Sequence, residues 1–250
     1  MESYRLEGQT FVIDDYDRKP AFSSFLPGLA GVKGIPLWTF YTNRGQGMNS
    51  FGIDNKGNAI MEFNSANTAF ENTQVKGFRT FLKIDGEYYE PFFTYEKEAK
   101  RQMRMNKNSF KIIETNEKYG IEVTVNYYVL PNESIGALVR QVSVKNIGDS
   151  AKEVQVIDGL PKIITYGIAN GEFKEMSNLF KSWADIRNLE NKVPYYTLRA
   201  STKDSAEVSD VEGGYYYLTV RDGKLQDVIY DVDTVFGYDL SLMTPVNFID

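Results

Sequence analysis

The chain of 250 residues contains no histidine and no cysteine. Without these side chains the usual triads and dyads of nucleophilic catalysis cannot be built, and zinc or copper would lose their preferred ligands. Any chemistry would therefore rest on carboxylates, tyrosine, lysine or arginine, and we expect no metal site. The lack of cysteine also fits a reducing compartment, and we expect a cytoplasmic protein.

The sequence also lacks long apolar runs and an excess of basic charge. No stretch approaches the ~18 consecutive apolar residues of a membrane-spanning helix. The acidic start, residues 1–20, has no positive region followed by an apolar core, so we predict no signal peptide. With 28 Lys and Arg against 34 Asp and Glu, the formal net charge is −6. This balance argues against nucleic acid or an anionic membrane as a partner.

Alternation of apolar and polar residues is the dominant pattern in the sequence. In IEVTVNYYV, residues 121–129, every second residue from Ile121 to Val129 is apolar or aromatic, which predicts a strand with one buried face. Turn residues predict four strand pairs, with turns at Asp54–Asn58, Asp85-Gly86, Asn146–Ser150 and Asp222-Gly223. Short strands at regular spacing predict a mainly β, antiparallel two-sheet sandwich rather than βαβ units.

One segment departs from the period of two. Large apolar residues recur there at helical spacing: Phe173, Met176, Phe180 and Trp183. We predict one amphipathic helix over 172–189 that covers a sheet face and ends before Pro194. No repeat or low-complexity linker divides the chain, so residues 1–250 are predicted to form a single domain.

Two glycine-rich stretches, GLAGVKG at 28–34 and NRGQG at 43–47, attract attention as possible phosphate loops. Neither matches a dinucleotide fingerprint or a Walker loop, so we predict no nucleotide site. In the second stretch Arg44 and Gln46 offer planar donors and acceptors that suit hydroxyls or phosphate. The alternative is architectural: Gly45 and Gly47 satisfy turn or bulge geometry, and Arg44 pairs with a local acid.

Aromatic residues are abundant, with 17 Tyr and 16 Phe. Adjacent tyrosines on a strand point to opposite faces, so one of each pair can face outward as an interface anchor or a platform for sugar stacking. Tyr89 and Tyr128 are the candidates, and the alternative is that a second layer covers them. Asp231 and Asp233 would share one face of a predicted strand, as a glycosidase pair requires. In a chain with 34 acidic residues we interpret them as a solvated strand face.

Several blocks of the sequence, in order, resemble one known family. They are residues 22–84, which begin FSSFLPGLAGVKGIPLWTFYTNRGQG, residues 177–220, and VFGYDLSL at 235–242. They are similar to the N-terminal region of glycoside hydrolase family 94, the inverting sugar phosphorylases that include cellobiose phosphorylase and the phosphorylase part of cyclic β-1,2-glucan synthases. Within the family the likeness is to the 1,2-β-oligoglucan phosphorylases.

The resemblance implies the N-terminal β-supersandwich of a modular enzyme. Family members continue into linker helices, an (α/α)6 barrel that carries the general-acid aspartate, and a C-terminal β module. Inorganic phosphate attacks the anomeric carbon directly, so the second carboxylate of a hydrolase is not needed. Residues 1–250 do not include the barrel, and family sandwiches extend beyond the equivalent of Asp250. We therefore expect no catalytic residue and no cofactor in this chain, with phosphate as co-substrate of the parent enzyme.

The role implied for such a domain is homodimer formation and shaping of the substrate entrance. The expected partners are the catalytic barrel, a homodimer partner and β-glucan oligosaccharides. Candidates for contact with a glycan or the active-site edge are Asn43, Arg44 and Gln46. The alternative is a stand-alone carbohydrate-binding module that holds β-glucan on Tyr89 and Tyr128. A complete mutarotase-like enzyme is disfavoured, because such enzymes rely on histidine. A docked barrel also predicts an exposed apolar patch near Phe180 and Trp183.

Overall fold

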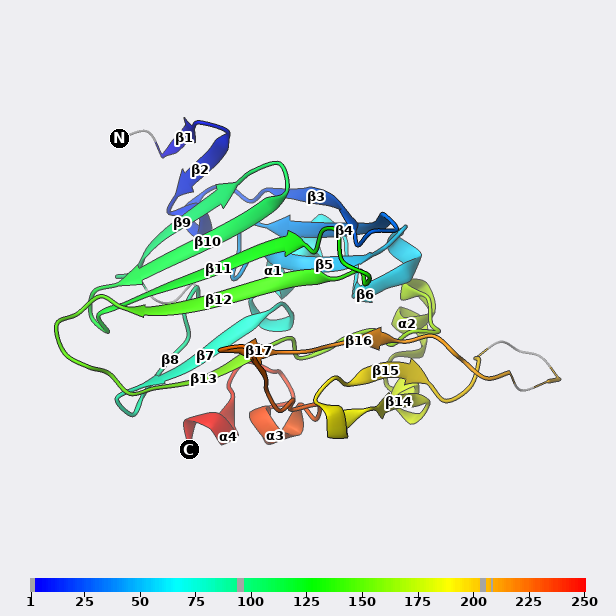
Figure 1. Ribbon diagram of the computed structural model, residues 1–250. Coiled ribbons are helices and arrows are strands. Elements are labelled where there is room, and N and C mark those ends of the chain that lie inside the picture. Colours follow the sequence, from blue (N-terminus) through cyan, green and yellow to red (C-terminus); the bar gives the residue numbers. More distant parts are fainter. Residues whose placement is uncertain (1–2, 94–96, 203–205, 208) are drawn as a thin grey trace.

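The computed structural model describes residues 3–93, 97–202, 206–207 and 209–250 (Figure 1). The chain is built mainly from antiparallel β-sheets with few helices, which confirms the predicted mainly β sandwich. Among the described residues no helix is long and apolar enough to cross a membrane.

The larger layer is a six-stranded sheet in the order β1-β2-β9-β10-β11-β12. Its strands are β1 (Tyr4–Glu7), β2 (Thr10–Asp14), β9 (Lys100–Met105), β10 (Ser109–Asn116), β11 (Ile121–Val129) and β12 (Leu138–Asn146). Along β11 alternate residues from Ile121 to Tyr127 are buried, as the sequence predicts, and Val129 is half-buried.

The opposing layer consists of two smaller sheets that lie beside each other (Figure 1). One has the order β3 (Ser23–Ala30), β4 (Ile35–Thr42), β5 (Met48–Ile53) and β6 (Ala59–Met61); the other has the order β13 (Val154–Gly159), β7 (Arg79–Ile84) and β8 (Glu87–Tyr89). The main core lies between the layers. It joins Phe110 and Val125 of the large sheet to Leu26 and Met48 of the four-stranded sheet and Leu82 of the three-stranded one.

Three of the four predicted hairpins are confirmed. Asp85 and Gly86 have φ of 51° and 89°, and this left-handed pair closes the β7–β8 hairpin as a type I′ turn requires. β5 and β6 pair across 54–58, and β17 (Val220–Arg221) pairs with β18 (Lys224–Leu225) across Asp222-Gly223.

The hairpin predicted at 146–150 is wrong. β12 pairs with β11, whereas β13 pairs with β7, so this connection carries the chain from one layer to the other. A two-residue turn forces its flanking strands to pair, but the longer connection between β12 and β13 leaves the choice of neighbour to the packing.

The helices differ from the prediction in number and extent. α1 (Ala66–Lys76) was not predicted, because it buries only Ala69 and Thr73 and so shows no large apolar stripe. α2 (Asn170–Met176) passes into a 3-10 turn at 177–182 and then into β14 (Ala184–Arg187), so the single helix predicted over 172–189 is wrong in its second half. Residues 184–187 pair as a strand with β15 (Tyr195–Leu198) instead of continuing the helix.

The remaining elements are short. They are β16 (Tyr215–Tyr216), α3 (Asp233–Phe236), α4 (Val246–Ile249), and 3-10 turns at Tyr16–Arg18, Lys56–Asn58 and Leu189–Asn191. Asp231 lies ahead of α3, and its carboxylate accepts a hydrogen bond from the backbone N–H of Asp233 at 3.1 Å. The shared strand face predicted for these two acids is therefore wrong, because the pair forms the start of a helix.

A second apolar cluster covers the outer side of the four-stranded sheet. Phe173 and Phe180 are buried in it together with Ala59, and Met176 and Trp183 pack against them. The 172–183 stripe thus faces the chain's own sheet. Phe180 is only 4% exposed, so the exposure predicted for this residue is wrong, whereas Trp183 is half-buried.

Candidate functional site

The NRGQG loop connects β4 to β5 deep inside the sandwich. Gly45 and Gly47 have φ of 49° and 81°, a region that side chains rarely adopt. A Cβ on Gly47 would lie 2.3 Å from Cζ of Phe110, and one on Gly45 would lie 3.0 Å from Cα of Gln74. The turn and the close packing therefore both require glycine here.

Asn43 is fully buried and uses its whole amide within the chain. Its Oδ1 accepts from the backbone N–H of Phe22 at 2.9 Å, and its Nδ2 donates to the carbonyls of Tyr16 and Pro20, both at 2.9 Å. Asn43 thus ties the 16–22 segment to the loop, and the structure does not place it at a surface edge.

Gln46 is also buried, at 3% exposure, and it meets an arginine of the opposing layer. Its Oε1 accepts from the guanidinium of Arg140 and from the hydroxyl of Thr80. Arg140 donates in addition to Asp158 of β13, and its guanidinium lies 5.2 Å from the ring centre of Phe78. Burial alone would lower the Arg140 pKa, but the Asp158 carboxylate and the Tyr127 hydroxyl together outweigh it, and the pKa is raised. Gln46 therefore joins the two layers.

Arg44 is the one candidate of this loop that reaches solvent. Its guanidinium donates to the carbonyls of Asn43 at 2.8 Å and Lys19 at 3.4 Å, and among the described residues no carboxylate pairs with it. It borders a pocket of about 310 Å³. The other residues that line this Arg44 pocket are Phe70, Glu71, Gln74, Val75, Phe93 and Met243. A half-buried cation without a carboxylate partner can attract hydroxyls or an anion.

The two tyrosine candidates differ in solvent exposure. Tyr89 is 4% exposed, and its hydroxyl donates to the Glu114 carboxylate and accepts from Asn116 Nδ2 at 3.0 Å. Burial raises its pKa. The outward orientation predicted for Tyr89 is thus wrong; its neighbour Tyr88 is the half-buried one. Tyr128 is half-buried on the outer face of β11.

The buried acidic residues form structural ion pairs. Arg101 donates to Asp17 at 2.6 Å and to Glu114 at 2.5 Å, and all three side chains are at most 4% exposed. Arg79 pairs in the same way with Glu90 at 2.7 Å. In the described part of the chain no cluster of three or more acidic side chains could hold a metal ion.

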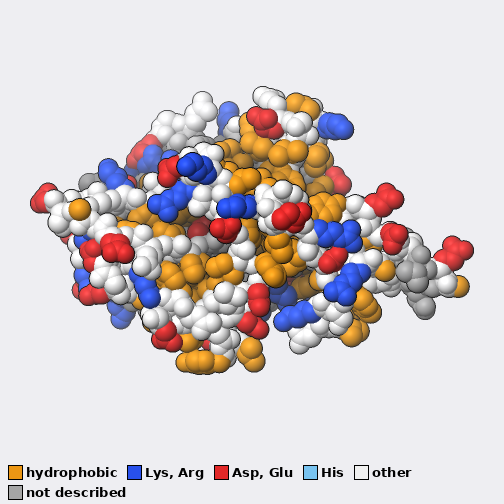
Figure 2. All heavy atoms as spheres, turned by 60° about the horizontal axis from the view of Figure 1, so that its bottom comes forward, with side chains coloured by type: hydrophobic (Ala, Val, Ile, Leu, Met, Phe, Trp, Pro, Cys, Tyr) orange, Lys and Arg blue, Asp and Glu red, His pale blue; other side chains and the backbone are white. Residues whose placement is uncertain are grey.

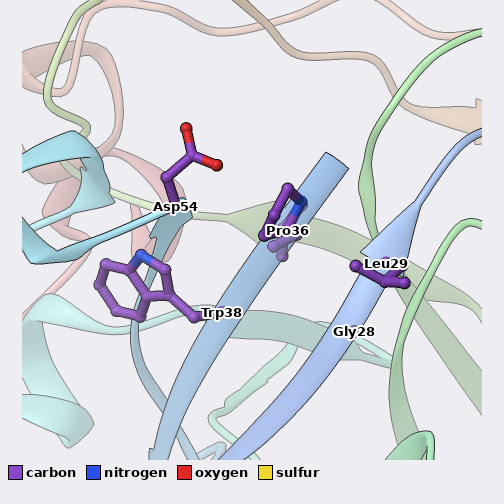
Figure 3. Close-up of a pocket in the computed structure, with 6 residues that line it drawn as sticks. Gly28, Leu29, Pro36, Trp38 and Asp54 are labelled. Atoms are coloured by element: carbon purple, nitrogen blue, oxygen red, sulfur yellow. The ribbon is translucent and has the colours of Figure 1, made fainter. Parts of the chain in front are cut away.

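A second pocket, which the sequence analysis missed, lies at the outer end of β3 and β4 (Figure 3). It is open, measures about 400 Å³, and is lined by Gly28, Leu29, Pro36, Leu37, Trp38 and Asp54. We call it the Trp38 pocket. Its members are 26 positions apart at most, but only the strand register, in which Leu29 lies opposite Pro36, brings them together. The signal in the sequence is limited to the apolar Leu29 and Pro36 on either side of a short glycine-bounded segment close to a tryptophan.

The C-terminal part of the chain exposes many large apolar side chains. The C-terminal apolar surface consists of Leu218, Val220, Leu225, Ile229, Tyr230, Tyr238, Leu240 and Met243. Figure 2, which looks at the side of α3 and α4, shows hydrophobic side chains spread over this face. Met243 also lines the Arg44 pocket, so that pocket adjoins the C-terminal apolar surface.

No family profile matches the chain, and no curated protein matches its sequence. The fold and these features define a β-sandwich protein with surface pockets beside Trp38 and Arg44 and an exposed apolar C-terminal segment.

Proposed function

We propose that this chain is the non-catalytic N-terminal supersandwich domain of an inverting β-1,2-oligoglucan phosphorylase. The parent enzyme converts β-glucosides and phosphate to α-glucose 1-phosphate, and this domain serves dimerisation, docking of the catalytic barrel and shaping of the substrate entrance. The ordered resemblance of three sequence blocks supports the family. The observation that carries the assembly role is the C-terminal apolar surface beside the Arg44 pocket.

Buried residues of the C-terminal segment lie close in sequence to the exposed residues of the C-terminal apolar surface. Val235 and Phe236 pack against Phe81, whereas Tyr238 and Leu240, a few residues on, are 84% and 86% exposed. Covering a large apolar side chain contributes about 1.5–3 kcal/mol. A segment that exposes several large apolar side chains is typical of interaction regions. A docked barrel or second subunit would bury them.

The Arg44 pocket adjoins the C-terminal apolar surface and could contact substrate there. The Arg44 guanidinium lacks a carboxylate partner among the described residues, and Met243 belongs both to the pocket and to the C-terminal apolar surface. A partner docked on that surface would therefore lie next to Arg44. At such a border the guanidinium can donate to sugar hydroxyls or phosphate entering between the two bodies.

The test compares variants of the parent enzyme in assembly and in phosphorolysis of β-1,2-glucooligosaccharides. Tyr238→Ser combined with Leu240→Ser should weaken dimer or barrel association and lower the rate of glucose 1-phosphate release. Leu6→Ser is the control, because Leu6 is 71% exposed on β1, away from α3 and α4 (Figure 1). Arg44→Met should raise KM with assembly intact.

Two results would overturn the proposal. One is full assembly and activity in the Tyr238→Ser, Leu240→Ser enzyme. The other is turnover by residues 1–250 alone, measured as glucose 1-phosphate formed from phosphate and β-1,2-glucooligosaccharides.

A stand-alone carbohydrate-binding module for β-glucans is the second candidate, and the Trp38 pocket favours it. A module would bind glucan tightly without any other domain. Calorimetric titration of the chain with sophorose and longer β-1,2-glucans, together with the variant Tyr128→Ala, tests whether the outward face of β11 takes part.

A further inference from the structure

We propose that the Trp38 pocket binds a neutral oligosaccharide, at a site separate from the Arg44 pocket. The choice of a β-glucan as this oligosaccharide rests on the proposed function. The geometry of the pocket supplies the class of ligand: a row of apolar side chains with one carboxylate beside Trp38 and Pro36 (Figure 3).

The floor of the Trp38 pocket is a row of apolar side chains. Pro36 and Trp38 lie two residues apart on β4 and so share one face of the sheet, and Leu29 lies opposite Pro36 on β3. Leu29 is 66% exposed and Pro36 is exposed as well. The volume of about 400 Å³ lies within the range of small-molecule sites.

Trp38 is held as a fixed platform in this row. Its Nε1 donates to the Asn55 carbonyl at 3.1 Å, and the edge of its ring system meets Phe63 at a centroid distance of 5.6 Å. Gly52 lies opposite Trp38 on β5, and a Cβ there would lie 2.7 Å from Cζ2 of the indole. The absence of a side chain at Gly52 therefore lets the indole lie close over the neighbouring strand.

Asp54 supplies the polar end of the pocket. Its backbone is in the left-handed region, with φ of 60°, and its N–H donates to the Pro36 carbonyl at 2.9 Å. The side chain is exposed, and no described residue donates a hydrogen bond to its carboxylate or forms an ion pair with it. Such a carboxylate can accept hydrogen bonds from neighbouring hydroxyls.

A sugar ring fits both halves of this arrangement, because it presents C–H groups on its faces and hydroxyls at its edge. Aromatic side chains with one apolar face and a polar neighbour suit such ligands. An organic cation would also be attracted to an indole and a carboxylate. Cation sites gain from enclosure by several rings, however, whereas here one ring continues into the aliphatic Leu29 and Pro36 on an open surface. The shape thus favours an extended neutral chain.

The chain has only two tryptophans, and this makes a direct test possible. In Trp183→Phe, Trp38 is the only indole, so the emission of this variant reports on the pocket. Titration with sophorose and longer β-1,2-glucooligosaccharides should change the emission saturably. Adding Asp54→Asn should weaken binding about tenfold, the usual loss for a hydrogen bond to a charged group. Trp38→Phe, which keeps an apolar ring, should weaken binding measured by calorimetry.

Asp222→Asn is the matched control. Asp222 is also an exposed aspartate with positive φ, of 50°, at a hairpin turn, and its substitution should leave the glucan titration unchanged. Three results would overturn the proposal: no saturable response to glucans, a response to tetramethylammonium alone, or unchanged affinity in Asp54→Asn. The titration requires neither catalysis nor assembly. Its failure would leave the assembly role standing, and loss of the assembly role would leave the sugar site standing.

Discussion

Replacing Arg101 by methionine should destabilise the fold by about 3–5 kcal/mol at neutral pH, the usual cost of removing one partner of a buried ion pair. The Arg101 side chain is 1% exposed and donates to both Asp17 and Glu114, which are 4% and 1% exposed. Methionine keeps most of the volume but leaves two buried carboxylates without their cation. We therefore expect the loss at the upper end of this range.

The pH dependence of this loss distinguishes a charge effect from a packing effect. Burial raises the pKa of Glu114, and the Arg101 guanidinium opposes that rise. Without Arg101 the folded-state pKa should rise further. A carboxyl with a raised folded-state pKa contributes stability at pH values below its unfolded pKa, and this contribution is lost as the pH rises through the folded pKa. The deficit of Arg101→Met should thus shrink as the pH falls from about 7 to about 5.

Urea unfolding of wild type and variant at both pH values measures this deficit. Arg104→Met is the control, because Arg104 is 28% exposed and pairs with Glu7 at the surface; its loss should cost below about 1 kcal/mol. A cost of Arg101→Met as small as that of the control, or a deficit that is the same at both pH values, would contradict the buried-charge effect.

Three further predictions follow from packing and burial. Gly47→Ala should lower the free energy of unfolding in urea by about 3 kcal/mol, because backbone strain adds to a clash with Phe110. Gly86→Ala, with a similar positive φ but open space around it, should lower it by about 1 kcal/mol. Equal losses would refute the clash. Burial raises the pKa of Tyr196 to about 12 from 10.0, so its contribution to stability should be complete below pH 10.0 and lost as the pH rises through about 12, as tyrosine absorbance and unfolding in parallel can show. Phe180→Ala should cost about 3–5 kcal/mol and the exposed Leu179→Ala below about 0.5 kcal/mol, and a reversed order in thermal unfolding would contradict the assigned burial.

Features with a local physical cause could be predicted from the sequence. The period of two over 121–129 determines β11, because successive side chains on a strand point to opposite faces. Asp-Gly pairs determine two hairpins, because both residues tolerate the left-handed backbone that a two-residue turn needs. Helix α1 escaped prediction because Ala69 and Thr73 carry its contacts, and small residues leave no periodic signal.

Part of the candidate site also depended on information that the sequence does not contain. Alternation says that Tyr88 and Tyr89 face opposite ways, but it does not say which of them faces the core; the layer built by β10 and β11 decided that Tyr89 is buried. In the loop, Arg44 lines a pocket, whereas Arg140 from the other layer holds Gln46 inside.

The sequence by itself thus determined the class of fold, three of its hairpins and the lack of a histidine- or cysteine-based centre. The tertiary structure decided which strands are neighbours, as in the separation of β12 from β13, and which side chains meet. The Trp38 pocket exists because pairing of β3 with β4 and of β4 with β5 brings Leu29, Pro36 and Gly52 around one indole. In these two hairpins the connecting loops and the burial of one sheet face set the register, and their loops carry no Asp-Gly signal of the kind that identified the other hairpins.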